Sequence, residues 1–357
     1  MAQIIALFNH KGGVSKTTTV FNLGWMMANQ GKRVLLVDTD PQCNLTGVIL
    51  GMKQLDELST LSNEGTPRNI QDGLRPAFDS QPKPIEPVEC MPVNGPETLF
   101  LMPGSIRLAE YEVTLGIAQE LSGSLSALRN IPGSIRHLID ITAEKYQADY
   151  VLVDMSPSLG ALNQNVLTIS DYFIVPLHPD YFSTMGIDSL AATLPRWKRW
   201  ADSASSHPVL AEAAYPFIYA APTYLGSVVQ KYRPRAGNRP AQAFQQWIDE
   251  LQAAVDQKLV PALRKADMVL ADGIYNGCGA SLSNPLVQMS DFNSLIAKSQ
   301  ASQVPIFELT VDQLGTRGNV LDAELEAQAR FRDLFAELSS KVICLTTNDD
   351  RLDTLPI

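Results

Sequence analysis

The sequence predicts an α/β fold, a doubly wound and mostly parallel sheet with helices on both faces. Short apolar runs of strand length alternate along the chain with helical patterns, the order that places a parallel sheet between two helical layers. These runs are continuously apolar rather than alternating, which is typical of strands covered on both faces. Ligands bind such sheets at the carboxyl ends of the strands, so the loops after the strands are the first candidates for a site.

The predicted strands are short and rich in Val, Ile, Leu and aromatic residues. They cover residues 4–8, 34–37, 98–102, 150–153, 172–177, 217–221 and 304–309. The predicted helices between them cover residues 17–29, 106–123, 133–145, 241–263 and 321–338. This order predicts a single domain over residues 1–345. It contains a loop-rich excursion at about 60–97 and a divergent, basic segment at about 196–240, and it is followed by a polar, acidic tail at 346–357 that we expect to lack regular structure.

The composition is that of an ordinary globular protein, with 357 residues of which 45% are hydrophobic. No apolar stretch approaches the roughly 20 residues of a membrane-spanning helix, and no signal peptide is recognisable. We therefore expect a cytoplasmic protein. Its cysteines are dispersed without a C-x-x-C pair, so we expect reduced thiols rather than disulfides or a metal site. They are Cys43, Cys90, Cys278 and Cys344.

The loop after the first predicted strand has the layout of a phosphate-binding loop. Residues 9–19 read Asn-His-Lys-Gly-Gly-Val-Ser-Lys-Thr-Thr-Thr and lead into a predicted helix. Backbone N–H groups of such a loop bind anions, and Lys16 followed by Thr17 fits its phosphate-binding lysine and Mg²⁺-binding hydroxyl. The strict pattern G-x-x-x-x-G-K-[ST] fails at His10 and Ser15. A tight Gly-Gly turn is the alternative, and the two lysines and three threonines around it disfavour that interpretation.

Carboxylates end two further predicted strands. Asp38 and Asp40 follow one strand, and Asp154 follows another. Because the carboxyl ends of parallel strands meet at one edge of a sheet, we expect these groups beside the phosphate loop. Asp40-Pro41 and the stretch 157–160 also read as ordinary turns.

Together these motifs resemble the ParA/MinD family of deviant Walker A P-loop ATPases. Residues 11–17, Lys-Gly-Gly-Val-Ser-Lys-Thr, resemble the family loop with its second lysine, although Ser15 replaces a glycine. Residues 38–44 resemble the family's D-x-D-P-Q-x-N. Residues 154–160 resemble its D-x-P-P-S-L-G, with Ser156 in place of a proline. The resemblance is close for residues 3–200 and holds only in pattern beyond them.

The resemblance implies ATP and Mg²⁺ as cofactors and an ATP-sandwich homodimer. Lys11 would reach the phosphates of the facing subunit, Lys16 would bind the phosphates of its own nucleotide, and Asp40 would orient or activate the attacking water. These three are the implied catalytic residues.

The resemblance also implies a ligand set. Thr17, Asp38 and Asp154 would hold or support the metal. The implied nucleotide contacts are Lys11, Gly12, Gly13, Val14, Ser15, Lys16, Thr17, Thr18 and, near the adenine, Pro222. We expect serine at position 15 to affect the rate of ATP hydrolysis more than the affinity for ATP.

Appendages distinguish the branches of the family. A MinD-type protein ends in a basic amphipathic helix, whereas residues 348–357 are acidic and contain a proline, which predicts no membrane attachment. The first predicted strand begins near residue 3, which leaves no room for an N-terminal helix-turn-helix. The chain therefore resembles a ParA/Soj-like partition ATPase, with slow hydrolysis stimulated by a ParB-like or other partner protein.

The charge distribution suggests an anionic partner. The formal net charge is −10, yet residues 196–239 carry +5. The densest basic residues are Lys231, Arg233, Arg235 and Arg239. They predict non-specific, salt-sensitive binding of duplex DNA and association with the nucleoid.

Other interpretations stay open at this point. The basic residues also fit a solvated loop. A ParA-like ATPase could instead position a protein cargo, or act as a nucleotide-switch regulatory subunit, without binding DNA. An electron donor of the nitrogenase-reductase kind would need cluster-binding cysteines, which the dispersed cysteines do not supply.

Overall fold

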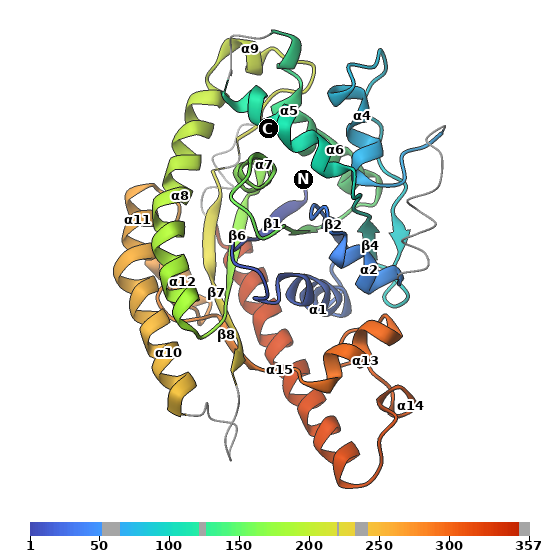
Figure 1. Cartoon of the computed structure of the whole chain (residues 1–357), viewed down its shortest axis with the longest axis vertical. Helices are drawn as coiled ribbons and strands as arrows, with labels where there is room; N and C mark the ends of the chain where they lie inside the picture. Colours follow the sequence, from blue (N-terminus) through green and yellow to red (C-terminus); the bar gives the residue numbers. More distant parts are fainter. Residues whose placement is uncertain (52–64, 121–125, 220, 233–241, 350–357) are drawn as a thin grey trace.

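The computed structural model describes residues 1–51, 65–120, 126–219, 221–232 and 242–349. Within them, an eight-stranded sheet has the order β3-β4-β2-β5-β1-β6-β7-β8 (Figure 1). All neighbouring strands are parallel except β3, which runs antiparallel to β4. This confirms the predicted doubly wound fold. The strands are β1 Gln3–Leu7, β2 Val34–Asp38, β3 Met91–Pro92, β4 Leu99–Met102, β5 Tyr150–Asp154, β6 Tyr172–Leu177, β7 Thr223–Tyr232 and β8 Val287–Ser290.

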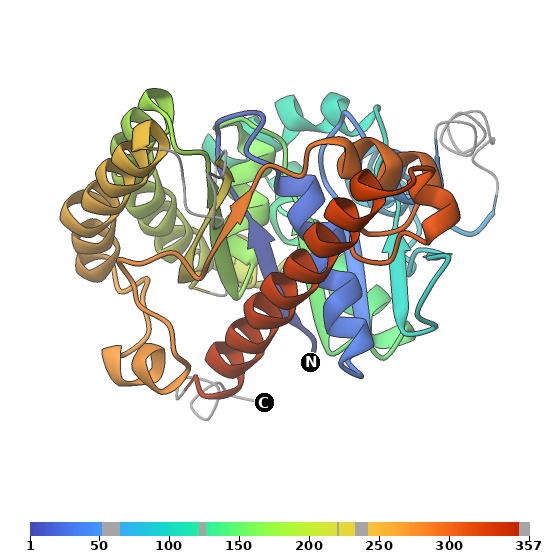
Figure 2. The ribbon, with the colours of Figure 1, turned by 90° about the horizontal axis from the view of Figure 1, so that it is seen from below.

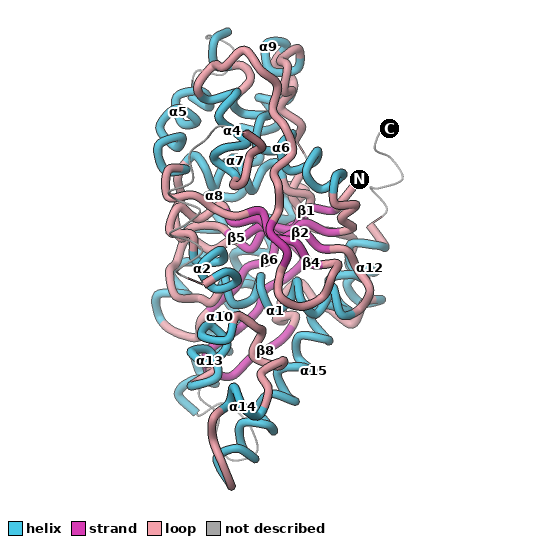
Figure 3. The backbone as a smooth tube through the Cα atoms, turned by 90° about the vertical axis from the view of Figure 1, so that its right-hand side faces the viewer, coloured by secondary structure: helices cyan, strands magenta, loops and turns pink. Residues whose placement is uncertain are grey.

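Helices cover both faces of the sheet. Helices α1, α2 and α13–α15 lie on one face, and α4–α7 lie on the other (Figures 1 and 3). The long α15 runs along α1 (Figure 2), and α8 packs against α10 and α11 beside β7. The helices are α1 Lys16–Asn29, α2 Asn44–Leu50, α4 Ile70–Phe78, α5 Leu108–Glu120, α6 Ile131–Lys145, α7 Ala161–Ile169, α8 Tyr181–Ser205, α9 Pro208–Ala211, α10 Gln242–Ala254, α11 Val260–Lys265, α12 Asp272–Gly277, α13 Ser294–Ser302, α14 Val311–Leu314 and α15 Asn319–Thr347, with a 3₁₀ turn at Ser126–Leu128 and a π-helical turn at Val255–Leu259.

Two predicted strands are wrong. Residues 217–221 form no strand where they are described; Phe217 packs edge-on against Trp200, and Ala221 has a φ of 52°, which a strand cannot accommodate. Residues 304–309 are a turn whose buried Ile306 donates its backbone N–H to Asn22 in α1. Both runs are apolar because they pack into the core as loops. The real strands there, β7 and β8, were not predicted.

The loop-rich excursion and the acidic tail also differ from prediction. Residues 65–97 contain α4 and β3, and buried Ile70 and Leu74 anchor α4 in the core. Helix α15 extends into the predicted tail as far as Thr347. The buried carboxylate of Asp349 then accepts a hydrogen bond from the Tyr172 hydroxyl at 2.9 Å. Residues 350–357 lie outside the described part of the chain.

The prediction that all cysteines are reduced is also wrong. A disulfide joins Cys278, just after α12, to Cys344 near the end of α15, across 66 residues of sequence. Cys43 and Cys90 are free and buried, and burial raises the pKa of each thiol to about 12. The sequence could not show this pairing because it depends on how α12 meets α15. Among the described helices, none is long and apolar enough to cross a bilayer.

Candidate nucleotide-binding site

Three strand ends meet at the carboxyl edge of the sheet. In the register of the strands, Leu7 at the end of β1 lies beside Asp154 at the end of β5, and Asp154 lies beside Asp38 at the end of β2. The phosphate loop follows β1 directly. The sheet therefore brings the loop and both predicted carboxylates together, as the sequence predicted.

The phosphate loop leaves the N-terminus of α1 without a side-chain cap. Ser15 precedes the helix with a left-handed backbone (φ 60°), and its side chain makes no capping hydrogen bond to the first N–H groups. Gly13 also has a positive φ of 75°. The Ser15 hydroxyl is buried, with no hydrogen-bond partner among the described residues. Helix N–H groups and a hydroxyl that lack protein partners fit an anionic ligand such as a phosphate chain.

Lys16 lies within the loop and is nearly buried, with 7% of its surface exposed. Its ammonium donates to the carbonyl oxygens of Asn9 at 2.9 Å and Lys11 at 3.3 Å. Burial lowers the pKa of Lys16, and the carboxylates of Asp154 and Asp40 act in the opposite direction. A cation held in this way beside helix N–H groups is suited to bind phosphate oxygens.

Thr17 and Asp154 form a pair suited to a divalent cation. The Thr17 hydroxyl donates to one oxygen of Asp154 at 2.7 Å. The other oxygen of Asp154 is buried and has no hydrogen-bond partner among the described residues. Burial and the neighbouring Asp38 raise the pKa of Asp154 well above its ordinary value. Because Mg²⁺ takes oxygen ligands and compensates such buried negative charge, the pair fits Mg²⁺ bound with phosphates.

Hydrogen bonds engage both oxygens of Asp38, which is predicted to support the metal. One accepts from the backbone N–H of Asp40 at 3.1 Å. The other accepts from the backbone N–H and the hydroxyl of Thr46, at 2.8 and 2.7 Å. Burial raises the pKa of Asp38 to about 6, although the bonds from Thr46 oppose the shift. Asp38 therefore anchors α2 beside Asp154, and its part in supporting a metal stays a prediction.

Asp40 is 4% exposed and lines the pocket beside the loop. Its oxygens accept from the backbone N–H of Gln42 at 2.9 Å and from the Asn44 amide at 3.3 Å. These bonds fix the carboxylate at the start of α2. A fixed carboxylate in this position can accept a hydrogen bond from a water molecule near the phosphates.

Lys11 is not among the residues that line the pocket. Its ammonium lies 2.5 Å from both oxygens of Asp180 and 2.9 Å from the Ser183 hydroxyl, at the start of α8. The ring of Phe182 lies 6.0 Å away. Burial acts to raise the pKa of Asp180, but the bonds from Lys11 and Ser183 outweigh it and lower the pKa.

The pocket beside the loop has walls that the motifs did not reveal. Its volume is about 250 Å³. Besides the predicted Gly12, Gly13, Val14, Ser15, Lys16, Thr17, Thr18 and Asp40, it is lined by Asn44, Val48, Met155, Pro157, Lys231, Ile296 and Gln300. Ile296 and Gln300 are one turn apart on α13, so they face the pocket together. Asn44 and Pro157 lie inside recognised motifs and could have been predicted; residues from β7 and α13 carry no such signal.

The structure places Pro222 and Lys231 at opposite ends of β7. Pro222 precedes β7, whose first residue, Thr223, pairs with Tyr172 at the start of β6. Pro222 therefore lies at the amino edge of the sheet, opposite the phosphate loop, and its assignment to adenine is wrong. Lys231, predicted to bind DNA, lies at the other end of β7 and donates to the Gly13 carbonyl at 2.8 Å. Arg233, Arg235 and Arg239 lie outside the described residues.

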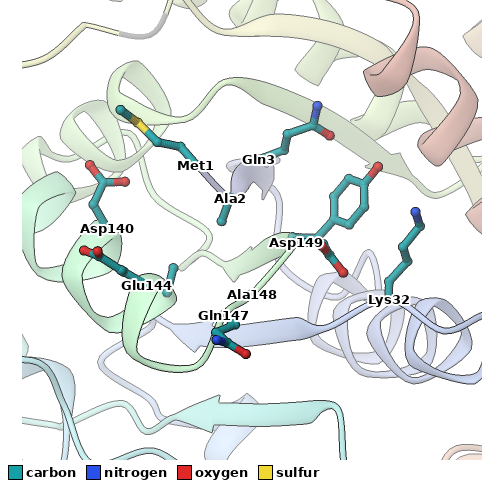
Figure 4. Close-up of a pocket in the computed structure, with 11 residues that line it drawn as sticks. Met1, Ala2, Gln3, Lys32, Asp140, Glu144, Gln147, Ala148 and Asp149 are labelled. Carbon is teal, nitrogen blue, oxygen red and sulfur yellow. The ribbon is translucent and has the colours of Figure 1, made fainter. Parts of the chain in front are cut away.

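A larger hollow of about 810 Å³ lies at the amino edge of the sheet (Figure 4). Residues before or at the starts of strands line it, including Gln3, Lys32 and Asp149, together with Asp140 and Glu144 of α6. It has no helix N-terminus and no glycine loop, and most of its charged side chains are acidic. Such a lining does not suit a phosphate chain, so we place the site at the smaller pocket.

Comparisons with known proteins agree with the fold and with the family that the motifs indicate. A family model described as an AAA domain matches residues 2–204. The chain is 33% identical to the sporulation initiation inhibitor protein Soj of Bacillus subtilis over 194 residues, 54% of this chain and 65% of that protein. It is 35% identical to the chromosome-partitioning ATPase Soj of Thermus thermophilus over 192 residues, 53% of this chain and 60% of that protein.

A structure of pNOB8 ParA bound to non-specific DNA superposes with a TM-score of 0.57 at 18% identity, covering 98% of this chain and 100% of that one. At that identity the likeness concerns the fold. The chain belongs to the ParA/MinD family of P-loop ATPases. The matches to the two Soj proteins span less than two thirds of their length.

Proposed function

We propose that this protein is a ParA-type ATPase that binds Mg²⁺-ATP at the carboxyl edge of its sheet, dimerises around the nucleotide and hydrolyses it slowly. The observation that carries the proposal is the Thr17–Asp154 pair, with its unpartnered carboxylate oxygen, next to the uncapped helix start at Lys16. Bound Mg²⁺ would offset phosphate charge. Thr17 and Asp154 would hold it, and Lys16 and the loop N–H groups would bind the phosphates.

Exposed apolar side chains near the site support dimerisation. Tyr181, Phe182 and Met185 on the first turns of α8 are 56%, 68% and 55% exposed, and Leu159 after β5 is 41% exposed. They follow strand ends at the same edge as the phosphate loop, next to Lys11. An exposed apolar patch favours association, and a second copy of the chain would bring Lys11 to the partner's nucleotide. In the dimer, ATP hydrolysis would stay slow until a ParB-like or other activating protein binds.

DNA binding is a second, more specific part of the proposal. Its remaining support is the basic sequence of Arg233, Arg235 and Arg239, together with Arg196 and Arg199, which are exposed on α8. We propose a cytoplasmic protein that associates with the nucleoid through these residues in its ATP-bound dimer. One observation favours the second candidate, a ParA-like ATPase that positions a protein cargo or serves as a nucleotide switch without DNA. Lys231, one of the four residues predicted to bind DNA, donates to the Gly13 carbonyl of the phosphate loop.

Two measurements test the proposal and separate the candidates. Sedimentation of Asp40→Ala should show a dimer with Mg²⁺-ATP and a monomer without nucleotide; a monomer in every nucleotide state would exclude dimerisation. Filter binding to duplex DNA at several salt concentrations should then compare the parent with Arg233, Arg235 and Arg239 all changed to Ala. Loss of these contacts should flatten the log–log salt dependence by roughly 0.9 per contact. No ATP-dependent binding by the parent would favour the second candidate.

A further inference from the structure

Asn163, in the first turn of α7, is a buried polar residue that hydrogen-bonds to the turn before its helix. The residue is 0% exposed. Its side-chain amide donates to the carbonyl oxygens of Ser156 at 2.8 Å and Ser158 at 2.9 Å, and its amide oxygen accepts from the Ser156 hydroxyl at 3.3 Å. Side chains in a helix lean towards its N-terminus, so Asn163 reaches back to the chain that enters α7. One amide thus ties residues 156–158 together.

The turn that Asn163 holds connects the nucleotide pocket with the exposed apolar face. Pro157 lines the pocket, and its ring lies over Gly12 of the phosphate loop, 3.9 Å from the place that a Cβ on Gly12 would occupy. Two residues further along, Leu159 is 41% exposed and belongs to the face that we propose for dimerisation. The conformation of this turn therefore sets the position of Pro157 at the loop and the position of Leu159 at the face.

The turn is held by hydrogen bonds at a position where the family motif has a ring. The motif D-x-P-P-S-L-G has a proline where this chain has Ser156. A proline would fix φ near −65° and so restrict the turn by itself. Serine leaves the backbone free to rotate, but its hydroxyl and its carbonyl both bond to Asn163. Asn163 and Ser156 together thus supply a restriction that a proline supplies covalently.

We propose that Asn163 is a positioning residue for dimerisation, because it fixes the turn that carries Pro157 to the nucleotide and Leu159 to a second copy of the chain. This inference rests on the proposed ATP-dependent dimer. A turn that is not fixed beforehand must lose its conformational freedom when the subunits meet, and fixing one backbone residue weakens an association by about tenfold. In a symmetric dimer this loss counts twice, once for each subunit. Asn163 is not among the residues that line the pocket, so nucleotide binding by the monomer should change little.

The test compares Asn163→Ala with a matched control in the same helix. Asn165 is also 0% exposed, and its amide donates to the Pro132 carbonyl at 2.9 Å, away from the turn. Sedimentation with Mg²⁺ and a non-hydrolysable ATP analogue should show a dimer dissociation constant about 100-fold higher for Asn163→Ala and within about threefold of the parent for Asn165→Ala. Calorimetry with the same nucleotide, at protein concentrations too low for dimerisation, should give affinities within about threefold for all three proteins.

A second substitution separates positioning from stability. Adding Ser156→Pro to Asn163→Ala restricts the turn again without the amide, so the dimer dissociation constant should return to within about tenfold of the parental value. Removing a buried amide lowers the melting temperature of Asn163→Ala and of Asn165→Ala alike, so a general loss of stability would weaken both dimers equally. If Asn163→Ala does not fold, Asn163→Thr fills nearly the same volume without the amide and has the same expected effect.

Several results would overturn the inference. If the parent dimerises and Asn163→Ala dimerises equally well, Asn163 does not position the turn, although the proposed ATPase stands. If Asn163→Ala and Asn165→Ala are equally impaired, the cause is stability. If Ser156→Pro does not restore dimerisation, the restriction of the turn is not what matters. A parent that stays monomeric with the nucleotide analogue refutes the proposed dimer itself.

Discussion

The part of the chain up to α8 and the part from β7 to α15 contribute to one pocket in different ways. The first part supplies the residues proposed for phosphate and metal binding, with Thr17 bonded to Asp154 and Lys16 bonded to the backbone of the phosphate loop. The second part supplies walls, through Lys231, Ile296 and Gln300. Phosphate chemistry demands particular residue types at fixed spacing, whereas a wall demands only shape and polarity. Motifs are therefore recognisable in the first part and not in the second.

Polar contacts hold the second part in place over the first. The Gln303 amide donates to the Leu50 carbonyl at the end of α2, at 3.2 Å. The Gln328 amide of α15 donates to the carbonyls of Ile306 and Leu309, at 2.9 and 3.0 Å. These bonds fix the segment after α13 between α1 and α15. The segment that follows the wall helix is thus tied to α2 as well as to α15.

The largest expected effect lies in the first part. Lys16→Ala should weaken Mg²⁺-ATP binding by at least about 1,000-fold, because it removes the ammonium that lies within the loop. Calorimetry measures the change, with Lys265→Ala as the control for loss of a lysine elsewhere. Binding of ATP by Lys16→Ala at the parental affinity would mean that this loop is not the phosphate site.

The disulfide between Cys278 and Cys344 tests what stabilises the second part of the chain. Changing Cys278 and Cys344 together to Ser should lower the free energy of unfolding by about 2–4 kcal/mol, because the bond closes a long loop in the unfolded chain. Urea denaturation with and without a reducing agent measures this loss. The reductant should destabilise the parent and leave the double variant unchanged. An equal effect of reductant on both proteins would show that Cys278 and Cys344 are not joined.

A moderate effect on ATP affinity is expected at the pocket wall formed by α13. Ile296→Ala should weaken ATP binding by about fivefold, or roughly 1 kcal/mol, because a few methylene contacts with the nucleoside are lost. Binding of inorganic triphosphate should stay at the parental level. The pair of titrations separates the roles of the two parts, and an equal loss for both ligands would place Ile296 at the phosphates.

The smallest effect is expected at Ser15, in the loop itself. Ser15→Gly should raise the free energy of unfolding by up to about 1 kcal/mol, because glycine adopts the left-handed backbone found there without strain. Urea denaturation measures the gain, and ATP binding should persist. A destabilised variant would show that the buried Ser15 hydroxyl contributes more than its backbone costs.

The same contrast explains how far the sequence could predict the structure. Five of the predicted strands exist, β1, β2, β4, β5 and β6, and all were found because they are continuously apolar. Strands β1, β2 and β5 also end in recognisable motifs. Strand β7 was missed because it contains Ser227 and Gln230, which are buried and polar. It also contains Gly226, whose missing Cβ lets Leu286 approach closely. The apolar loop at 217–221 was predicted as the strand instead. Because Pro222 follows that loop, the adenine contact was wrongly predicted at Pro222.

The most direct test is a crystal structure of the protein with Mg²⁺ and a non-hydrolysable ATP analogue. The triphosphate should lie in the loop at residues 11–18, with Mg²⁺ next to Thr17 and Asp154 and the nucleoside between Lys231 and Ile296. A nucleotide bound in the hollow at the amino edge, beside Lys32 and Asp149, with no phosphate in the loop, would contradict the proposed site.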